Sequence, residues 1–362
     1  MRKLLIVSIC ILGSTMASWA CRYTVREIGF SSLSHSVYSI VIINSQADPL
    51  SEQYERIRKQ LTDSNIRLII LDPSKDQEHP ALVSALQQKI PFPTTILWSP
   101  SVKRVFRPQS DKLEELVSTI LFSPLRIKIS DLSFNHFAFT LLIESTKQEL
   151  NNKAFAILQK SCDDITNRMP NMPKQVTYGA KAIRITSGQF ESERVLLWAI
   201  GIDQIPETPL ALIMYGRGRI IGDILDYESI NNQEAFKRLA MIGADCECGL
   251  DRKWMLGPQI PMNWSSKTRQ LLADELGFDV DNPMVLAEMS HILSKEQITD
   301  LETDITFAPE EIDLELLLNG NSETENTEEK SNVEFIMPTI LIILGVSVVI
   351  IFTGLLILRR KR

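Results

Sequence analysis

The sequence is poor in the side chains from which most catalytic and metal sites are built. It holds four histidines and five cysteines in 362 residues. The histidines are His35, His79, His136 and His291. They lie far apart, no Ser-His-Asp order accompanies them, and no glycine-rich loop opens a helix. Because histidine is the commonest metal ligand and general base, we expect no resident metal, no cofactor and no triad hydrolase.

The sequence also lacks a basic stripe. Its formal net charge is −7, and basic residues cluster only at positions 359–362, the last four of the chain. Proteins that bind nucleic acid carry a basic patch or stripe on the binding domain. The charge pattern therefore argues against nucleic acid as a partner.

The first twenty residues have the layout of a secretory signal peptide. Two basic residues precede an apolar run that is too short to span a bilayer, and small residues stand at Ser18 and Ala20. Such a segment is removed from the mature protein, so we expect the mature chain to begin at Cys21. Lipidation of Cys21 is the less favoured reading, because a lipobox needs an aliphatic residue in place of Ser18 and a small one in place of Trp19.

The C-terminal end predicts a membrane anchor. Residues 335–358, from Phe335 to Leu358, form an uncharged apolar run long enough to cross a bilayer as a helix. The basic tail 359–362 follows at once and should stay on the cytoplasmic side. Residues 319–334 are acidic and hold few large apolar side chains, so we expect a flexible stalk. The body would then be extracytoplasmic, most simply on the periplasmic face of a bacterial inner membrane.

Residues 21–124 predict one α/β unit. β-branched and apolar runs at 38–45, 66–72 and 90–100 are typical of buried strands, and 103–108 pairs with the third as a hairpin. Apolar residues at helical spacing occupy 49–64, 79–88 and 111–122. The predicted order is β-α-β-α-β-β-α.

Residues 125–245 predict a second unit with the same order. Strands are expected at 137–145, 180–186, 208–215 and 218–225, and helices at 151–169, 191–201 and 233–243. The two hairpins can be laid on each other, and each is entered through a proline, Pro93 in the first unit and Pro209 in the second. Residues 246–318 would add a Cys-x-Cys segment and short helices at 265–278 and 283–293.

This arrangement resembles the thioredoxin-like fold over most of the mature body. In that family a cis proline opens the strand before the hairpin, so the resemblance implies that Pro93 and Pro209 each follow a cis bond. The family's chemistry needs Cys-x-x-Cys between the first strand and its helix. Here those loops, 44–53 and 144–153, contain no cysteine. Both units therefore resemble the non-catalytic thioredoxin-like domains of disulfide isomerases.

Four cysteines remain in the mature chain, and an even set outside the cytoplasm suggests disulfides. Cys162 shares a helical stripe with apolar residues, which favours a small buried side chain, although a bridge from Cys21, Cys246 or Cys248 to it stays open. Cys246 and Cys248 stand in a dense stretch, CECGLDRKWMLGP, that the first unit lacks. They suit a structural bridge, a strained redox pair or, less well, two thiolate ligands for a soft metal.

The sequence therefore predicts a non-enzymatic, membrane-anchored protein whose extracytoplasmic body binds a protein partner at the membrane. The alternative from another class is a thiol-disulfide redox protein acting through Cys246 and Cys248.

Overall fold

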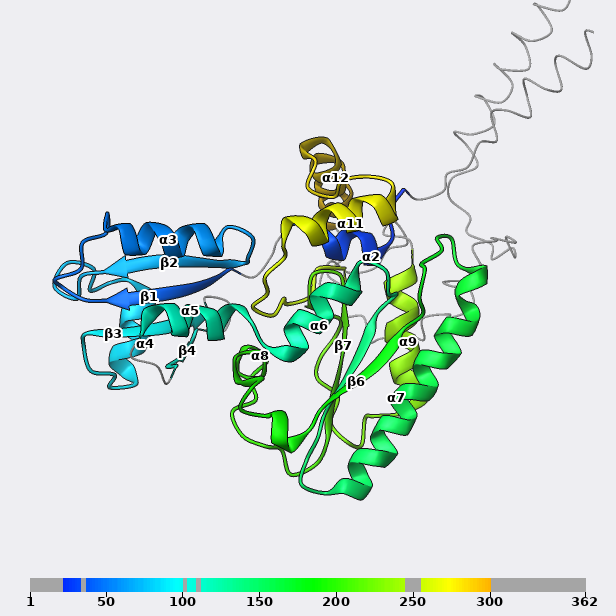
Figure 1. Cartoon of the computed structure of the whole chain (residues 1–362). Helices are drawn as coiled ribbons and strands as arrows, with labels where there is room; N and C mark the ends of the chain where they lie inside the picture. The colour runs from blue at the N-terminus through cyan, green and yellow to red at the C-terminus, as the bar shows by residue number, and fades with distance from the viewer. Residues whose placement is uncertain (1–21, 34–36, 100–102, 109–111, 245–254, 301–362) are drawn as a thin grey trace, which may run out of the picture. The chain divides into compact units, whose positions relative to one another are not determined.

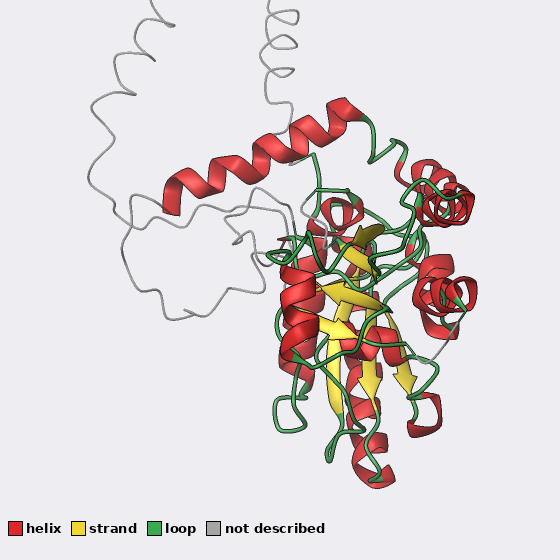
Figure 2. Cartoon of the chain, turned by 90° about the vertical axis from the view of Figure 1, so that its left-hand side faces the viewer, coloured by secondary structure: helices red, strands yellow, loops and turns green. Residues whose placement is uncertain are grey.

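The computed structural model describes residues 22–33, 37–99, 103–108, 112–244 and 255–300. These residues form two four-stranded sheets with helices on both faces, and further helices outside the two units (Figures 1 and 2). Among the described helices, none is both long and apolar enough to cross a bilayer. The predicted signal peptide, acidic stalk, membrane helix and basic tail lie outside the described residues.

The first unit has the element order that the sequence predicts. Its elements are β1 Tyr38–Ile43, α3 Glu52–Leu61, β2 Ile66–Leu71, α4 Pro80–Gln87, β3 Thr94–Ser99, β4 Arg104–Phe106 and α5 Leu113–Leu121. The strands lie in the order β2-β1-β3-β4, with β1 parallel to β2 and antiparallel to β3. All six residues of the central strand β1 are buried, which explains its almost continuous apolar run.

The second unit repeats this topology after a connecting helix, α6 Pro124–Ser133. Its elements are β5 Phe139–Ile143, α7 Gln148–Arg168, β6 Lys181–Ile185, α8 Arg194–Ala199, β7 Leu210–Tyr215, β8 Arg219–Ile220 and α9 Asn232–Gly243. The order β6-β5-β7-β8 matches that of the first sheet strand for strand. The chain therefore carries two thioredoxin-like units in tandem, as the sequence predicts.

Each sheet is covered on both faces because successive strand residues point to opposite sides. In the first unit Ile40 packs with α3 and α5, whereas Val41 packs with α4. In the second unit Leu142 packs with α7 and α9, whereas Leu141 packs with α6 and α8. Two sandwiches of helix, sheet and helix result.

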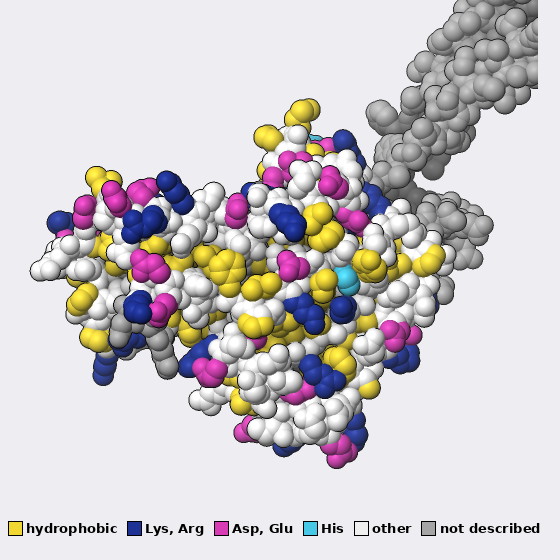
Figure 3. Space-filling model, viewed as in Figure 1, with side chains coloured by type: hydrophobic (Ala, Val, Ile, Leu, Met, Phe, Trp, Pro, Cys, Tyr) yellow, Lys and Arg dark blue, Asp and Glu magenta, His cyan; other side chains and the backbone are white. Residues whose placement is uncertain are grey.

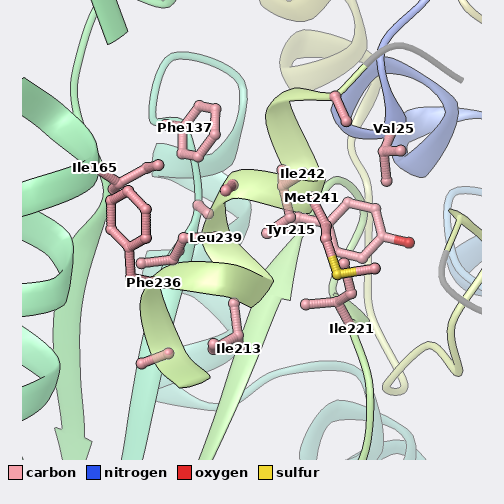
Figure 4. Packing of buried hydrophobic residues seen from close by; sticks show 14 of the residues in the cluster. Val25, Phe137, Ile165, Ile213, Tyr215, Ile221, Phe236, Leu239, Met241 and Ile242 are labelled. Carbon is pink, nitrogen blue, oxygen red and sulfur yellow. The ribbon is translucent and has the colours of Figure 1, made fainter. Parts of the chain in front are cut away.

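The N-terminal segment packs against the second unit, although the sequence grouped it with the first. Helix α2, Val25–Phe30, is buried at all six positions. Figure 4 shows Val25 beside Tyr215 of β7 and Met241 of α9. Gly29 lies against the β7–β8 turn, where a Cβ on Gly216 would come within 2.4 Å of the Gly29 backbone. The close approach of two backbones explains why glycine is needed on both sides.

The segment after the second unit joins the two units. Ile220 N–H donates to Pro258 O at 2.9 Å, and Ile260 N–H donates to Gly218 O at 3.0 Å, so residues 258–260 run along β8. Farther on, Trp264 N–H donates to Asp63 O of the first unit at 2.6 Å. The expected short helices follow as α11 Ser266–Leu276 and α12 Pro283–Asp300.

Candidate functional site

The loop of the first unit where the family carries its reactive cysteines lies beside Pro93. Ile43 pairs with Thr94, so residues 44–51 leave the sheet at the end where Pro93 enters it. The Phe92–Pro93 bond is cis, as predicted. The loop is closed by its own side chains: Asn44 Oδ1 accepts from Gln46 N–H at 2.9 Å. It offers amide and carboxylate groups and no thiol.

The matching loop of the second unit is held by buried polar contacts. Asn151 Oδ1 accepts from Ser145 N–H at 2.9 Å, and Asn151 Nδ2 donates to Ser145 O at 2.9 Å. Next to them the buried Glu144 carboxylate pairs with Arg184 at 3.0 Å. A ring of hydrogen bonds and an ion pair therefore fills the place that a reactive pair would occupy.

The expectation of a cis bond before Pro209 is wrong. Within the described residues the cis bond before Pro93 is the one present, and the Thr208–Pro209 bond is trans. An X-Pro bond favours trans by about 0.5–1 kcal/mol unless its surroundings select cis, and Pro209 enters β7 without that selection.

Cys162 is a buried free thiol. It is fully enclosed in the second core, on the stripe of α7 that includes Leu158 and Ile165. Burial raises the pKa of the Cys162 thiol to about 11, and its Sγ lies 3.4 Å from Thr140 Oγ1. The small apolar role that the helical spacing predicted is confirmed. The alternative, a disulfide at Cys162, is not formed because the side chain points into the core.

Cys21, Cys246 and Cys248 lie outside the described residues. Their described neighbours are nevertheless close in space, since Val25 N–H donates to Ala244 O at 3.0 Å. Val25 comes four residues after Cys21, and Ala244 comes two residues before Cys246. Among the described residues, no group of three or more histidine, cysteine, aspartate or glutamate side chains is arranged to hold a metal ion.

Three buried arginines, which the sequence interpretation missed, bind main-chain oxygens at helix C-termini. Arg26 donates to Ser133 O and Phe134 O at the end of α6. Arg126 donates to Thr119 O and Ile120 O at the end of α5. Such carbonyls have no partner within their own helix and carry the negative end of its dipole. The arginines thus fix the ends of helices that lead from one unit to the next.

The third of these arginines, Arg219, is fully buried in β8. Its guanidinium donates to Gly29 O at 3.2 Å and Ser31 O at 3.3 Å beyond α2, and to Gly257 O at 3.3 Å. The sequence interpretation treated Arg219 only as part of a tight hairpin. The available signal was its position next to two isoleucines in a short strand, where a charged side chain must find buried partners.

A groove of about 370 Å³ runs along β6, the edge strand of the second sheet. We call it the β6 groove. It is lined by β6 itself, by Leu125 and Lys128 of α6 and by Phe155 of α7. Figure 3 shows Lys and Arg side chains beside apolar ones over α6 and β6. The groove therefore combines an apolar floor with basic flanks.

A second cavity, of about 340 Å³, lies between residues 62–65 and the segment that joins the units. Two ion pairs line it, Arg217 with Asp281 and Arg269 with Asp63. Each arginine is thus matched by an aspartate. The buried Nε of Arg217 and Oδ1 of Asp281 have no protein partner. Such a nearly neutral, polar cavity suits water or a small polar molecule.

Comparison with known proteins gives a limited result. No family model and no curated protein matches the chain. Among solved structures, one similar chain is the first two thioredoxin domains of Saccharomyces cerevisiae Eps1p, with a TM-score of 0.20 and 10% identity. The match covers 56% of this chain and 90% of that one. At that TM-score it carries no weight, and the tandem thioredoxin-like fold is given by the strand order and connectivity of the two sheets.

Proposed function

We propose that the chain is a membrane-anchored, extracytoplasmic binding protein that uses two redox-inactive thioredoxin-like units as a scaffold for a protein partner. The observation that carries the proposal is the second-unit loop, in which Asn151 and Ser145 close the site with hydrogen bonds. A side chain that satisfies a loop in this way stabilises it and leaves no nucleophile. The first-unit loop also lacks a thiol.

The anchoring part of the proposal rests on the sequence. Residues 335–358 have the length and composition of a membrane helix, and the basic tail places the C-terminus inside. A protease added outside spheroplasts should remove the body and leave residues 359–362 protected. Digestion of the tail with protection of the body would reverse the proposed topology.

The binding role is tested by crosslinking in native membranes, with the full chain carrying a C-terminal tag. We expect reproducible crosslinks from the body to one partner or one complex, mapped by mass spectrometry to described residues. A matched control is a chain in which the body is replaced by an unrelated globular domain on the same anchor. A body that enriches no partner beyond this control would count against the scaffold.

The alternative is a thiol-disulfide protein acting through Cys246 and Cys248. One position-based observation favours considering it: the pair follows Ala244, the residue that caps α9, on an addition that the first unit lacks. Turnover of a model disulfide substrate by the full chain, lost in Cys246→Ser and Cys248→Ser, would replace the scaffold with this activity. We expect no turnover above the buffer rate.

A further inference from the structure

The outer edge of β6 carries main-chain groups that have no partner within the described part of the chain. Lys181 N–H and Ile185 O both bond to β5 or its extension, at 2.9 Å each. In a parallel ladder, alternate residues bond to the same neighbour. The N–H and C=O groups of Ala182 and Arg184 therefore face away from β5, along the groove. Because β6 is the last strand of its sheet, this edge is a template for one more strand.

The two sides of the β6 groove differ in chemistry. On the α6 side stand Lys128 and Lys181, and neither forms an ion pair with a described acidic residue. The acid on this side, Glu193, is buried and accepts from Leu125 N–H at 2.8 Å. On the α7 side lies the ring of Phe155, with the Arg184 guanidinium 3.7 Å from its centroid.

Arg184 is already paired with Glu144. An extended segment entering the groove would thus meet unpaired positive charge on one side and an aromatic surface on the other. Since side chains alternate along a strand, the best match is a strand with acidic residues on one face and apolar residues on the other.

We propose that the β6 edge binds residues 310–316 of this same chain as a fifth strand of the second sheet. This segment reads Glu-Glu-Ile-Asp-Leu-Glu-Leu. From Ile312 onward, apolar and acidic residues alternate with a period of two, the pattern of a half-buried strand. Asp313 and Glu315 would face Lys128 and Lys181, while the apolar row would cover Phe155.

The chain is long enough for this contact. The described residues end at Asp300, and ten further residues reach up to about 35 Å when extended, comparable with the diameter of a small domain. Thr177, which leads into β6, donates from its Oγ1 to Glu275 Oε1 of α11 at 2.6 Å, so the helices that precede the segment already touch this side of the second unit. Tethering on one chain raises the effective concentration of the segment to the millimolar range.

The test is amide hydrogen exchange of the full-length chain in detergent, resolved at single residues. In the unmodified chain, Ala182 and Arg184 should exchange at least about tenfold more slowly than in Asp313→Lys/Glu315→Lys, whose charges oppose the groove. The internal control is β2, the edge strand of the first sheet, whose rates at Leu68 and Ile70 should not change. Equal rates at Ala182 and Arg184 in the two chains would overturn the proposal.

A charge exchange gives a second readout. Lys128→Glu/Lys181→Glu should also lose protection at Ala182 and Arg184. Combining it with Asp313→Lys/Glu315→Lys should restore protection, because the opposite charges again face each other. Failure of the combination to restore it contradicts the proposed pairing. Protection that grows with protein concentration would contradict binding within one chain.

This inference does not depend on the proposed binding role. A segment found on β6 in a chain that captures no partner would leave the inference standing and remove the scaffold. A captured partner without protection at β6 would do the reverse.

Discussion

The side-chain amide of Asn65 binds both main-chain polarities of the segment that joins the units. Its Oδ1 accepts from Met262 N–H at 2.8 Å, and its Nδ2 donates to Ile260 O at 2.9 Å. Asn65 belongs to the first unit, whereas residues 258–260 run along β8 of the second. One buried side chain therefore continues the hydrogen bonding of the second unit into the first.

Asn65→Ala should lower the free energy of unfolding by about 2 kcal/mol, because it leaves a buried N–H and a buried C=O without partners. Chemical unfolding of the full-length chain measures the change. The control is Asn152→Ala on the exposed face of α7, where we expect less than about 0.5 kcal/mol. Equal effects of the two changes would show that the Asn65 contacts add nothing to stability.

Arg219→Met should be among the most destabilising single substitutions in the chain. Methionine fills much of the same volume but leaves the main-chain oxygens beyond α2 and at Gly257 without a donor, at a cost of about 3 kcal/mol or more. Arg56→Met is the matched control, because Arg56 is exposed and faces Glu52 at 3.9 Å, a contact worth about 0.5 kcal/mol or less. A thermal melt of Arg219→Met no lower than that of Arg56→Met would contradict the assigned role.

Cys162 should make the chain less stable in alkali. Burial raises the pKa of its thiol from an ordinary value near 9 to about 11, so the folded chain keeps the proton in a range where the unfolded chain has lost it. The stabilising contribution is complete below pH 9 and falls as pH rises from 9 to 11, by at most about 1.4 kcal/mol per pH unit.

The measurement is the free energy of unfolding against pH for the unmodified chain and for Cys162→Ala. Tyrosines and lysines titrate in the same range in both chains, so the difference isolates the thiol. Parallel curves would mean that the Cys162 thiol ionises as readily in the folded chain as in the unfolded one.

Cys246 and Cys248 should be structural. The hydrogen bond from Val25 to Ala244 holds the chain near Cys21 beside the chain near Cys246, so we expect a bridge from Cys21 to one of the two. Peptide mapping without reduction should find it, and replacing its partner by serine should cost about 2–4 kcal/mol. Thiols that switch near −270 mV in a graded redox buffer, together with an unchanged melt, would instead support the redox alternative.

The element order of both units could be predicted because it depends on local patterns. β-branched runs and helical spacing recur in the same order in each half, and the two sheet orders agree with them. The cis bond at Pro93 followed from the family resemblance, but the same inference failed at Pro209. A proline at the start of a strand indicates its place in the fold and leaves its isomer to the surrounding contacts.

Other features depend on distant contacts that leave no periodic signal. Helix α2 spans six residues, too few to show a polar face, and all of them are buried, Arg26 and Glu27 included. Their partners stand more than a hundred residues away, at His136 and Lys174. Sequence patterns alone could not show which unit α2 joins. The β6 groove was also missed, because it is a gap between α6, α7 and β6 that exists only after they pack.

The position of α2 also bears on the order in which the chain can fold as it is made. The N-terminal residues emerge first, yet the groups that hold Gly29 belong to Arg217 and Arg219, and Val25 waits for Ala244. The first unit is complete in sequence by Leu121, long before those partners exist. Early domains generally fold as units during synthesis, so the first unit can form while residues 22–33 remain unpaired. Release of the finished body must await the second unit, and a chain stopped before Gly257 would expose an apolar N-terminal segment to chaperones and proteases.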